Sequence, residues 1–553
     1  MSKAPQIPGM LSLPERIFQR PDLALVVTGS LSCIRSLYQE AVRLEKTHQF
    51  FPCIQPAQAY AAGQNGLGLA KTLRQVLTIP EVGGVIIYAS CLDVLSQTDF
   101  DSIIEGLENP RSVPIRVLLR GPMVKRYRRP REDLERMLAE IPERGTAIPR
   151  EKRWFPPPRP DFYFVSSALQ YMPAMPVLLT AGGCGGDPES DSGGRPDYRL
   201  GHTRFNDIQL TLGAEATAAA AVIEEATAQP EVHRDRKVYL LSSAVPTFAG
   251  LDRSAVGDAV SRKGFSVQDL GCDGFTAGEP ALARALTTLT DLSAPGPAQP
   301  GKVDILGYCG AVLGKEALLA HGLEHLLKCG FDAGFWGAEG RQTNAAQLNW
   351  VVSASGLPQA EKLKKALGIP YLAGIPVGAK QMRLWRQTVN SILGHEEQLQ
   401  QMPLGTPLLQ GKRALVMGEP LLIQSIGRYL TDEQGCDHVT LAVYAPRPEQ
   451  RQFYRRLFPQ GTYSFFESPQ ELRALTQNAD LLLGDPEFDL GVLPLVPIPD
   501  PQVSGNRYAH IPYEIFGKKG AAWIAKNIKT IFYKGETVLT FSRSCWRLPW
   551  PGC

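Results

Sequence analysis

The sequence predicts an α/β protein in which helices cover parallel β-sheets. Short apolar runs recur along its 553 residues, and a Gly- or Ser-containing turn follows each of them. Such runs are typical of strands that are buried on both faces of a parallel sheet. Amphipathic stretches between the runs, such as QAEKLKKALG and EALLAHGLEHLLKCG, predict helices that connect the strands by right-handed crossovers.

The predicted strands are spread over the whole chain. In order they are LALVVTGS, GVIIYAS, IRVLLRG, PVLLTAGG, KVYLLSS, KVDILGY, LNWVVSAS, KRALVMGE and ADLLLGD. Segments rich in Pro and Gly interrupt them at 154–160, 185–197 and 293–302, where we expect linkers or long surface loops. QQMPLGTPLLQGK marks a further boundary. We therefore expect three Rossmann-like domains with parallel sheets, at residues 1–198, 199–400 and 401–553.

Composition indicates a soluble, cytoplasmic protein. The 58 Lys and Arg residues nearly balance the 55 Asp and Glu residues, so the net charge of +3 predicts no nucleic-acid partner. No apolar run approaches the roughly 18 residues that span a bilayer, and MSKAPQIPGM lacks the layout of a signal peptide. The 10 cysteines are too scattered for a disulfide framework, so we expect reduced thiols that could bind metal.

The strongest candidate site consists of two cysteines. Cys33 follows LALVVTGSLS and Cys91 follows GVIIYAS, so both thiols lie just past the carboxyl ends of predicted parallel strands. Ligands of open α/β sheets bind at that edge. Soft thiolates there could hold an iron–sulfur cluster, and the alternative is a pair of buried structural cysteines. Cys53, in FFPCIQP, is a third candidate ligand or another buried cysteine.

Other patterns give weaker indications. Glycines flank Cys184 in TAGGCGG, which is typical either of a loop close to a cofactor or of a plain turn. His321 and His325 have a spacing that could present two imidazoles to one metal, but the sequence indicates no third ligand. Motifs of zinc peptidases, serine hydrolases and P-loop proteins are absent from the sequence, which removes the usual indications of those classes.

The arrangement of these segments resembles component 1 of the nitrogenase superfamily. VVTGSLSC, ending at Cys33, is similar to a family turn that ends in a cluster cysteine. YASCLDVLSQTDFDSI is similar to the family strand that ends in the next cluster cysteine. AAGQNGL at 61–67 resembles a Gly-Gly-Gln-Asn stretch of β-type subunits. The most specific similarity is the strand, helix and Gly-Ile-Pro turn at 345–378, and GKRALVMGE, ADLLLGD and SGNRYAHIPYEIFGKKGAAWIA resemble the third domain.

The chain also departs from this family. The family has an earlier cluster cysteine about 25 residues before Cys33, where this sequence has QIPGM. The cysteine that anchors the catalytic cofactor of true nitrogenase falls near Ser353, and the anchoring histidine falls in VPIPDPQVSG, which contains none; His510 lies a few residues beyond. The resemblance therefore does not imply reduction of dinitrogen at a cofactor held by this chain.

The resemblance implies an oxidoreductase subunit. We expect the chain to pair with a homologous component 1 subunit, to help bind an iron–sulfur cluster of the 4Fe-4S type or larger at their interface, and to take electrons from an ATP-dependent iron protein. The expected ligands are Cys33 and Cys91, with Cys53 as a further candidate, and the substrate is an unidentified small molecule. Two alternatives stay open: a scaffold or carrier for metallocluster assembly, and a cluster-free structural subunit of such a complex.

Overall fold

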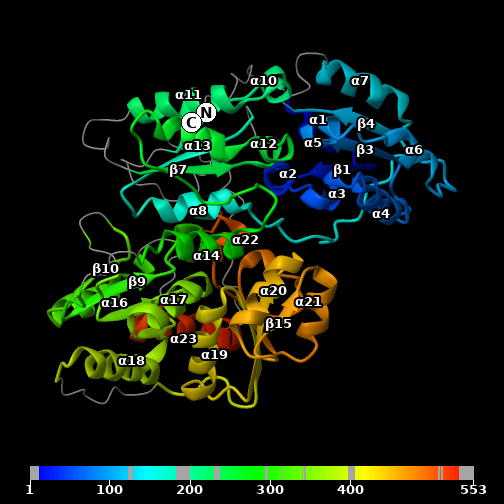
Figure 1. The fold of residues 1–553 in the computed structure, drawn as a ribbon. Coiled ribbons are helices and arrows are strands. Elements are labelled where there is room, and N and C mark those ends of the chain that lie inside the picture. Colours follow the sequence, from blue (N-terminus) through cyan, green and yellow to red (C-terminus); the bar gives the residue numbers. More distant parts are fainter. Residues whose placement is uncertain are drawn as a thin grey trace.

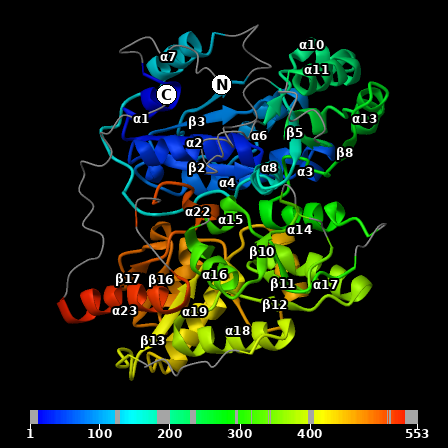
Figure 2. The same cartoon turned by 90° about the vertical axis from the view of Figure 1, so that its left-hand side faces the viewer.

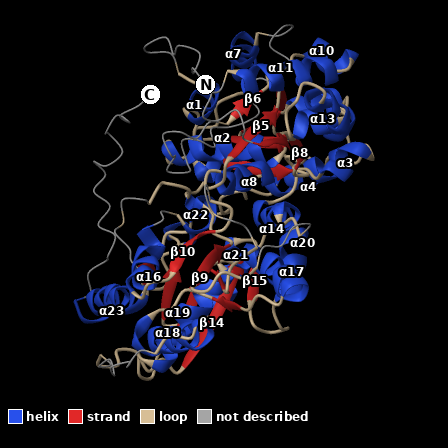
Figure 3. Ribbon diagram, turned by 60° about the vertical axis from the view of Figure 1, so that its left-hand side comes forward, coloured by secondary structure: helices blue, strands red, loops and turns tan. Residues whose placement is uncertain are grey.

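A computed structural model describes residues 11–121, 129–181, 200–228, 237–292, 297–314, 317–338, 341, 344–396, 405–508, 511 and 515–534. It is an α/β protein, as the sequence predicts. The strands of the described residues form four sheets, and every pair of neighbouring strands within them is parallel. In Figure 3 the strands lie between layers of helices.

The first sheet has the strand order β2-β1-β3-β4. Its strands are β1 (Leu23–Gly29), β2 (Phe50–Ile54), β3 (Gly84–Ala89) and β4 (Ile115–Leu119). The helices around it are α1 (Leu13–Phe18), α2 (Leu31–Arg43), α3 (Ala57–Ala61), α4 (Asn65–Leu77), α5 (Cys91–Leu95), α6 (Phe100–Glu105) and α7 (Pro130–Glu140). Every residue of β1 and β3 is buried, which explains why these central strands are continuous apolar runs.

The second sheet has the order β6-β5-β7-β8. Its strands are β5 (Ala174–Leu179), β6 (Gly201–His202), β7 (Lys237–Ser242) and β8 (Val267–Asp269). Its helices are α8 (Asp161–Leu169), α10 (Asp207–Leu212), α11 (Glu215–Thr227), α12 (Ala244–Phe248), α13 (Arg253–Ser261) and α14 (Gly278–Leu289). The expected domain boundary after residue 198 lies between β5 and β6 of this sheet, and the division into three domains stays a prediction.

The third sheet has the order β10-β9-β11-β12. It contains β9 (Lys302–Leu306), β10 (Asp332–Phe335), β11 (Leu348–Val351) and β12 (Tyr371–Ala373), with α15 (Gly310–Leu313), α16 (Ala317–Lys328), α17 (Leu357–Leu367) and α18 (Gly378–Leu393).

The fourth sheet has the order β15-β14-β13-β16-β17. Its strands are β13 (Arg413–Met417), β14 (His438–Tyr444), β15 (Ser464–Phe466), β16 (Leu481–Gly484) and β17 (Leu495–Pro497). Its helices are α19 (Pro420–Asp432), α20 (Pro448–Leu457), α21 (Pro469–Thr476), α22 (Pro501–Ser504) and α23 (Gly517–Lys534).

The four sheets are arranged in two halves. The first and second sheets form the upper half in Figure 1, and the third and fourth form the lower half; α14 and α22 lie between them (Figures 1 and 2). One continuous hydrophobic core joins α8 and α14 to the third and fourth sheets. The halves are therefore packed against each other through side chains, and their junction is an interior region of the protein.

The proline-rich segment 154–160 joins the first sheet to the second, as expected for a linker, but residues 155–160 are buried. Phe155 packs edge-on against Tyr444, Phe466 and Phe488 of the fourth-sheet unit, with ring centroids 5.1–5.8 Å apart. Tyr444 Oη donates a 2.9 Å hydrogen bond to the backbone oxygen of Pro156. The segment therefore fastens the two halves together, because Phe155 packs in the core of the fourth-sheet unit while Trp154 packs edge-on against Phe51 of β2.

Candidate functional site

Cys33 and Cys91 lie at the same edge of the first sheet. Cys33 is in the first turn of α2, after β1, and Cys91 is the first residue of α5, after β3. Because β1 and β3 are adjacent and parallel, with Val27 opposite Tyr88, both helices start from the carboxyl edge of the sheet. Cys33 is half-buried, whereas Cys91 is 4 % exposed. The structure thus places both predicted cysteines at one edge of the sheet.

Two glycines allow close packing around these cysteines. Gly29 has φ +147°, and a Cβ there would lie 3.3 Å from Cys33 Cβ and 3.0 Å from Ser90 Cβ. Gly121, just after β4, has φ +142°, and a Cβ there would lie 2.1 Å from Cys91 Sγ. Glycine is therefore needed at both positions, since the backbone approaches the two cysteine turns more closely than a side chain would permit.

Cys53 occupies a different environment. It lies within β2, opposite Thr28 of β1, and packs in the hydrophobic core between the sheet and α4. Gln55 Nε2 donates a 3.2 Å hydrogen bond to Cys53 Sγ. Burial raises the pKa of Cys53 to about 11. This strand position suits a small core residue, and the role of Cys53 as a third ligand stays a prediction.

A buried carboxylate, Asp93, lies directly behind the two cysteine turns and is 2 % exposed. Its Oδ2 accepts hydrogen bonds from Ser90 N at 2.8 Å and Ser90 Oγ at 2.7 Å. Its Oδ1 accepts from Tyr60 Oη at 3.1 Å and from Thr28 Oγ1 at 3.3 Å. Asp93 therefore connects β1, α3 and the turn between β3 and α5.

Burial is the main influence on the pKa values of Cys33 and Asp93. It raises the pKa of Cys33, and the negative charge of Asp93 adds to the effect, while a 3.6 Å hydrogen bond from Ser30 Oγ opposes it. Burial also raises the pKa of Asp93, against the hydrogen bonds that it accepts. The Cys33 thiol is therefore protonated when no metal is bound, and a soft metal ion would displace its proton.

The donor set at this edge fits part of an iron–sulfur cluster. Two thiols on neighbouring strand ends supply soft ligands, and one of them is accessible from outside the chain. No group of three His, Cys, Asp or Glu side chains that could hold a metal occurs among the residues that the structure describes. A cluster with four thiolate ligands would therefore need donors beyond this pair.

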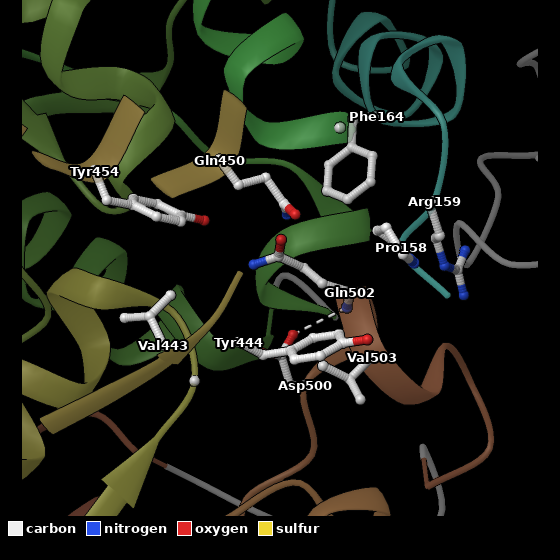
Figure 4. A pocket seen from close by; sticks show the side chains of 12 residues that line it. Pro158, Arg159, Phe164, Val443, Tyr444, Gln450, Tyr454, Asp500, Gln502 and Val503 are labelled. Atoms are coloured by element: carbon white, nitrogen blue, oxygen red, sulfur yellow. Dashed lines mark hydrogen bonds between the residues drawn. The ribbon is translucent and has the colours of Figure 1, made fainter. Parts of the chain in front are cut away.

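A cavity lies at the junction of the two halves, at the carboxyl edge of the fourth sheet (Figure 4). The volume of the cavity is about 420 Å³ when the space open to solvent is included. The part that is closed off from solvent has room for about one water molecule. The polar side chains that line it are Arg159, Tyr444, Gln450, Tyr454, Asp500 and Gln502. In Figure 4 the amides of Gln450 and Gln502 extend toward each other across it.

Buried carboxyl groups surround this cavity. Glu279 of α14 is fully buried and accepts a hydrogen bond from the Tyr454 hydroxyl, while no hydrogen-bond partner among the described residues reaches its Oε1. Burial and the nearby Glu419 and Asp500 raise the pKa of Glu279 well above its ordinary value. Burial raises the pKa of Asp500 to about 7. Protonated acids are therefore available at the junction near neutral pH.

Arg35 connects the cysteine edge to the cavity. It lies in α2, two residues after Cys33, and is 6 % exposed. Its Nη1 donates to the backbone oxygen of Pro157 and its Nη2 to that of Val503, at 2.7 Å for the latter. Because Val503 lines the cavity, a side chain only two residues from Cys33 reaches the cavity wall.

The remaining candidates are dispersed. His321 Nε2 lies 2.9 Å from Lys519 Nζ, whereas His325 is beside Trp385 and Cys329, so the two imidazoles have different surroundings. Ser353 is fully buried and donates a 2.6 Å hydrogen bond to the backbone oxygen of Gly307. Cys184 and His510 lie outside the described residues.

The sequence prediction missed Asp93 and Glu279. A signal for Asp93 was present, because Ser90-Cys-Leu-Asp93 has the spacing of a capping box, which the structure contains at the start of α5. Glu279 gave no such signal, since its neighbours Tyr454, Glu419 and Asp500 come from distant parts of the chain.

Comparison with known proteins gave one family match. The model of the family "Nitrogenase component 1 type Oxidoreductase" matches residues 174–530, which include the second, third and fourth sheets. The first sheet, with Cys33 and Cys91, precedes the matched residues. A search of curated proteins found no match.

Solved structures resemble the fold. Nitrogenase Cp1 at pH 6.5 aligns with 68 % of this chain and 93 % of its own, with a TM-score of 0.52 and 13 % identity. Nitrogenase Cp1 at pH 5 aligns with 68 % of this chain and 89 % of its own, with a TM-score of 0.47 and 14 % identity. No helix among the described residues is long and apolar enough to cross a membrane.

Proposed function

The chain belongs to the nitrogenase component 1 type oxidoreductase family, and we propose that it is one subunit of a nitrogenase-like reductase. In this proposal it pairs with a homologous subunit, shares an iron–sulfur cluster with it, and receives electrons from an ATP-dependent iron protein. The complex works in the cytoplasm, away from membranes and nucleic acid, and reduces a small molecule.

The pair of cysteines at the edge of the first sheet carries this proposal. Cys33 and Cys91 come from turns after adjacent parallel strands, and glycines bring the surrounding backbone close to them. Two thiolates from this chain and further ligands from a homologous partner would complete a cluster of the 4Fe-4S type or larger. The half-exposed position of Cys33 agrees with a cluster that lies between two chains rather than within one.

The residues around the cysteines would perform three tasks. Gly29 and Gly121 let the backbone pack closely against the two cysteine turns, Asp93 fixes these turns, and Arg35 joins α2 to the junction cavity. A bound cluster would supply electrons one at a time. The Tyr454–Glu279 pair and Asp500 carry exchangeable protons, which a reduction consumes together with electrons.

The surroundings of Ser353 argue against the chemistry of true nitrogenase. Where the family resemblance places a cofactor cysteine, this chain has a hydroxyl that donates to Gly307 and lies 2.7 Å from Ser355 Oγ. A hydroxyl engaged in this way is a poor ligand for iron, which favours sulfur donors in such clusters. We therefore propose a substrate other than dinitrogen.

The test is the iron and acid-labile sulfide content of anaerobically purified protein, co-expressed with its genomic neighbours and examined by electron paramagnetic resonance. Wild type, Cys33→Ala, Cys91→Ala and Cys53→Ala are compared with Cys329→Ala, a matched control that removes another half-buried cysteine. We expect the cluster to be lost in the first two variants and kept in the control. A wild type without iron would support the cluster-free structural subunit instead.

A scaffold for cluster assembly makes a different prediction from the same cysteine pair. A scaffold releases its cluster to an acceptor protein, whereas a reductase keeps it through repeated oxidation and reduction. Transfer of iron to an acceptor protein that lacks its cluster, measured after the two proteins are mixed, would therefore overturn the reductase proposal. Retention of the cluster while the iron protein reduces it repeatedly would support the reductase.

A further inference from the structure

Asp93 is more deeply buried than its role as a helix cap requires. A close comparison is Asp99, which caps α6 through hydrogen bonds from Ser102 N at 3.0 Å and Ser102 Oγ at 2.6 Å while exposed to solvent. In the capping box of α5 the N-cap is Ser90, and Asp93 accepts hydrogen bonds from the backbone and hydroxyl of Ser90; yet Asp93 is almost fully buried and accepts two more hydrogen bonds, from other elements. Burying a carboxylate is costly, so these extra contacts need an explanation beyond capping.

The additional hydrogen bonds join the two cysteine turns. Thr28 is in β1, one residue before Gly29, and Ser90 is the residue before Cys91. Any relative movement of the two strand ends would lengthen one of these bonds. The third partner, Tyr60, packs edge-on against Phe248 of α12, with ring centroids 5.8 Å apart. Asp93 is thus held from the first sheet and from the second-sheet unit at once.

We propose that Asp93 is a positioning residue that holds Cys33 and Cys91 at the separation a shared metal group needs and places a negative charge behind that group. This inference rests on the proposed function, because it assigns the two cysteines as ligands. Asp93 itself does not bind the metal: its two oxygens are occupied by the hydrogen bonds from Ser90, Tyr60 and Thr28.

The first test uses cadmium(II) as a probe of the empty thiol pair. The full chain is purified anaerobically without a cluster and titrated with cadmium(II) under mildly alkaline conditions, and thiolate-to-metal absorption reports binding. Asp93→Ala is expected to weaken binding by about tenfold or more, because buried hydrogen bonds to a charged acceptor are lost. Asp93→Asn retains an oxygen acceptor and is expected to restore part of the affinity. Asp99→Asn is the matched control and is expected to bind like wild type.

The second test is the midpoint potential of the reconstituted cluster, measured by redox titration with electron paramagnetic resonance. Asp93→Asn removes a negative charge behind the cluster. It is therefore expected to raise the midpoint potential, because the electron that the cluster gains on reduction is then repelled less. Asp99→Asn is expected to leave the potential unchanged. A merely structural role for Asp93 would lower cluster content without moving the potential of the clusters that form.

The results separate this inference from the proposed function. If wild type and Cys33→Ala bind cadmium(II) equally, the proposed function fails, whatever the Asp93 variants do. If Cys33→Ala abolishes binding while both Asp93 variants keep wild-type affinity and potential, the positioning role of Asp93 is overturned and the ligand assignment stands. Circular dichroism shows whether Asp93→Ala folds. If it does not fold, Asp93→Asn and Tyr60→Phe test the positioning role of Asp93 instead.

Discussion

The guanidinium of Arg35 donates a 2.7 Å hydrogen bond to the backbone oxygen of Val503, although 468 positions separate the two residues in the sequence. Arg35 belongs to the helix that begins beside Cys33, and Val503 lines the junction cavity. This hydrogen bond therefore links the helix that begins at the edge of the first sheet directly to the cavity wall of the fourth-sheet unit.

Replacing Arg35 by Met should loosen this connection. The substitution removes the hydrogen bonds to Pro157 and Val503 and leaves two buried carbonyl oxygens without these donors, so we expect the free energy of unfolding to fall by about 1–3 kcal/mol. Chemical denaturation measures the change. Arg43→Met is the control, because Arg43 is 55 % exposed in the same helix and its ion pair with Glu15 should contribute at most about 1 kcal/mol. Equal losses in both variants would contradict the connection.

Gly121→Ala should displace the Cys91 thiol. The new Cβ would lie 2.1 Å from Cys91 Sγ, so the side chain or the turn must shift, and we expect a loss of stability of about 1–3 kcal/mol together with reduced iron content. Gly63→Ala separates this clash from backbone strain, since Gly63 also has a positive φ, +64°, but no atom lies within 4 Å of a Cβ there. Iron content that falls equally in both variants would show that strain, and not contact with Cys91, is responsible.

Asp500 should make the protein less stable as the pH rises. Its pKa is raised from 3.8 to about 7 in the folded state, chiefly by burial, so the folded protein binds more protons than the unfolded chain between these values. Its contribution is therefore fully present below about pH 4 and is lost as the pH rises through about 7. Asp500→Asn should flatten this part of the pH dependence, measured by denaturation at a series of pH values.

Asp99 is a control whose pKa is shifted in the opposite direction from that of Asp500. Hydrogen bonds from Ser102 lower the pKa of Asp99, so its contribution is present above its unfolded pKa and is lost as the pH falls. Asp99→Asn should therefore leave the slope near neutral pH unchanged. A slope that Asp500→Asn does not alter would assign the pH dependence to other buried acids whose pKa is raised, such as Asp485, Glu279 and Glu419.

Gly278→Ala should disturb the packing of α14 on α8. A Cβ on Gly278 would lie 1.9 Å from Cδ2 of Phe164, so the Phe164 ring or α14 must shift, and we expect a loss of about 1–3 kcal/mol. Gly257→Ala, in the middle of α13, meets Val267 Cγ1 at an ordinary 3.8 Å and should stabilise its helix by up to about 1 kcal/mol. Thermal unfolding distinguishes the two variants, and a stabilised Gly278→Ala would contradict the packing described.

The sequence predicted most of the central strands, although it missed β14, which lies inside the fourth sheet. Each of the nine apolar runs contains a strand of the structure, such as LALVVTGS with β1 and KRALVMGE with β13. The strands at sheet edges were harder to predict: β8 and β12 are only partly buried and lack a continuous apolar run. The grouping of strands into four sheets depends on which segments pack together, and apolar runs of similar composition do not encode that choice.

The sequence located the two cysteines, and their role as cluster ligands stays a prediction. The position of Cys33 and Cys91 after neighbouring strands followed from strand prediction and the rule that ligands bind at the carboxyl edge. The environment of Cys53 did not follow, because an apolar run can present a cysteine either to a core or to a sheet edge. The acids around Tyr454 come from α14, α19 and the loop before α22, so only the folded chain shows that they meet.

The buried segment 154–160 has a consequence for synthesis on the ribosome. Phe155 emerges early, but the rings that cover it, Tyr444, Phe466 and Phe488, belong to the last third of the chain. Until the ribosome has made them, the Phe155 ring lacks the partners that bury it in the folded protein. Transiently exposed apolar surface of this kind promotes aggregation of a partly synthesised chain, and this exposure ends when the fourth sheet closes over Phe155.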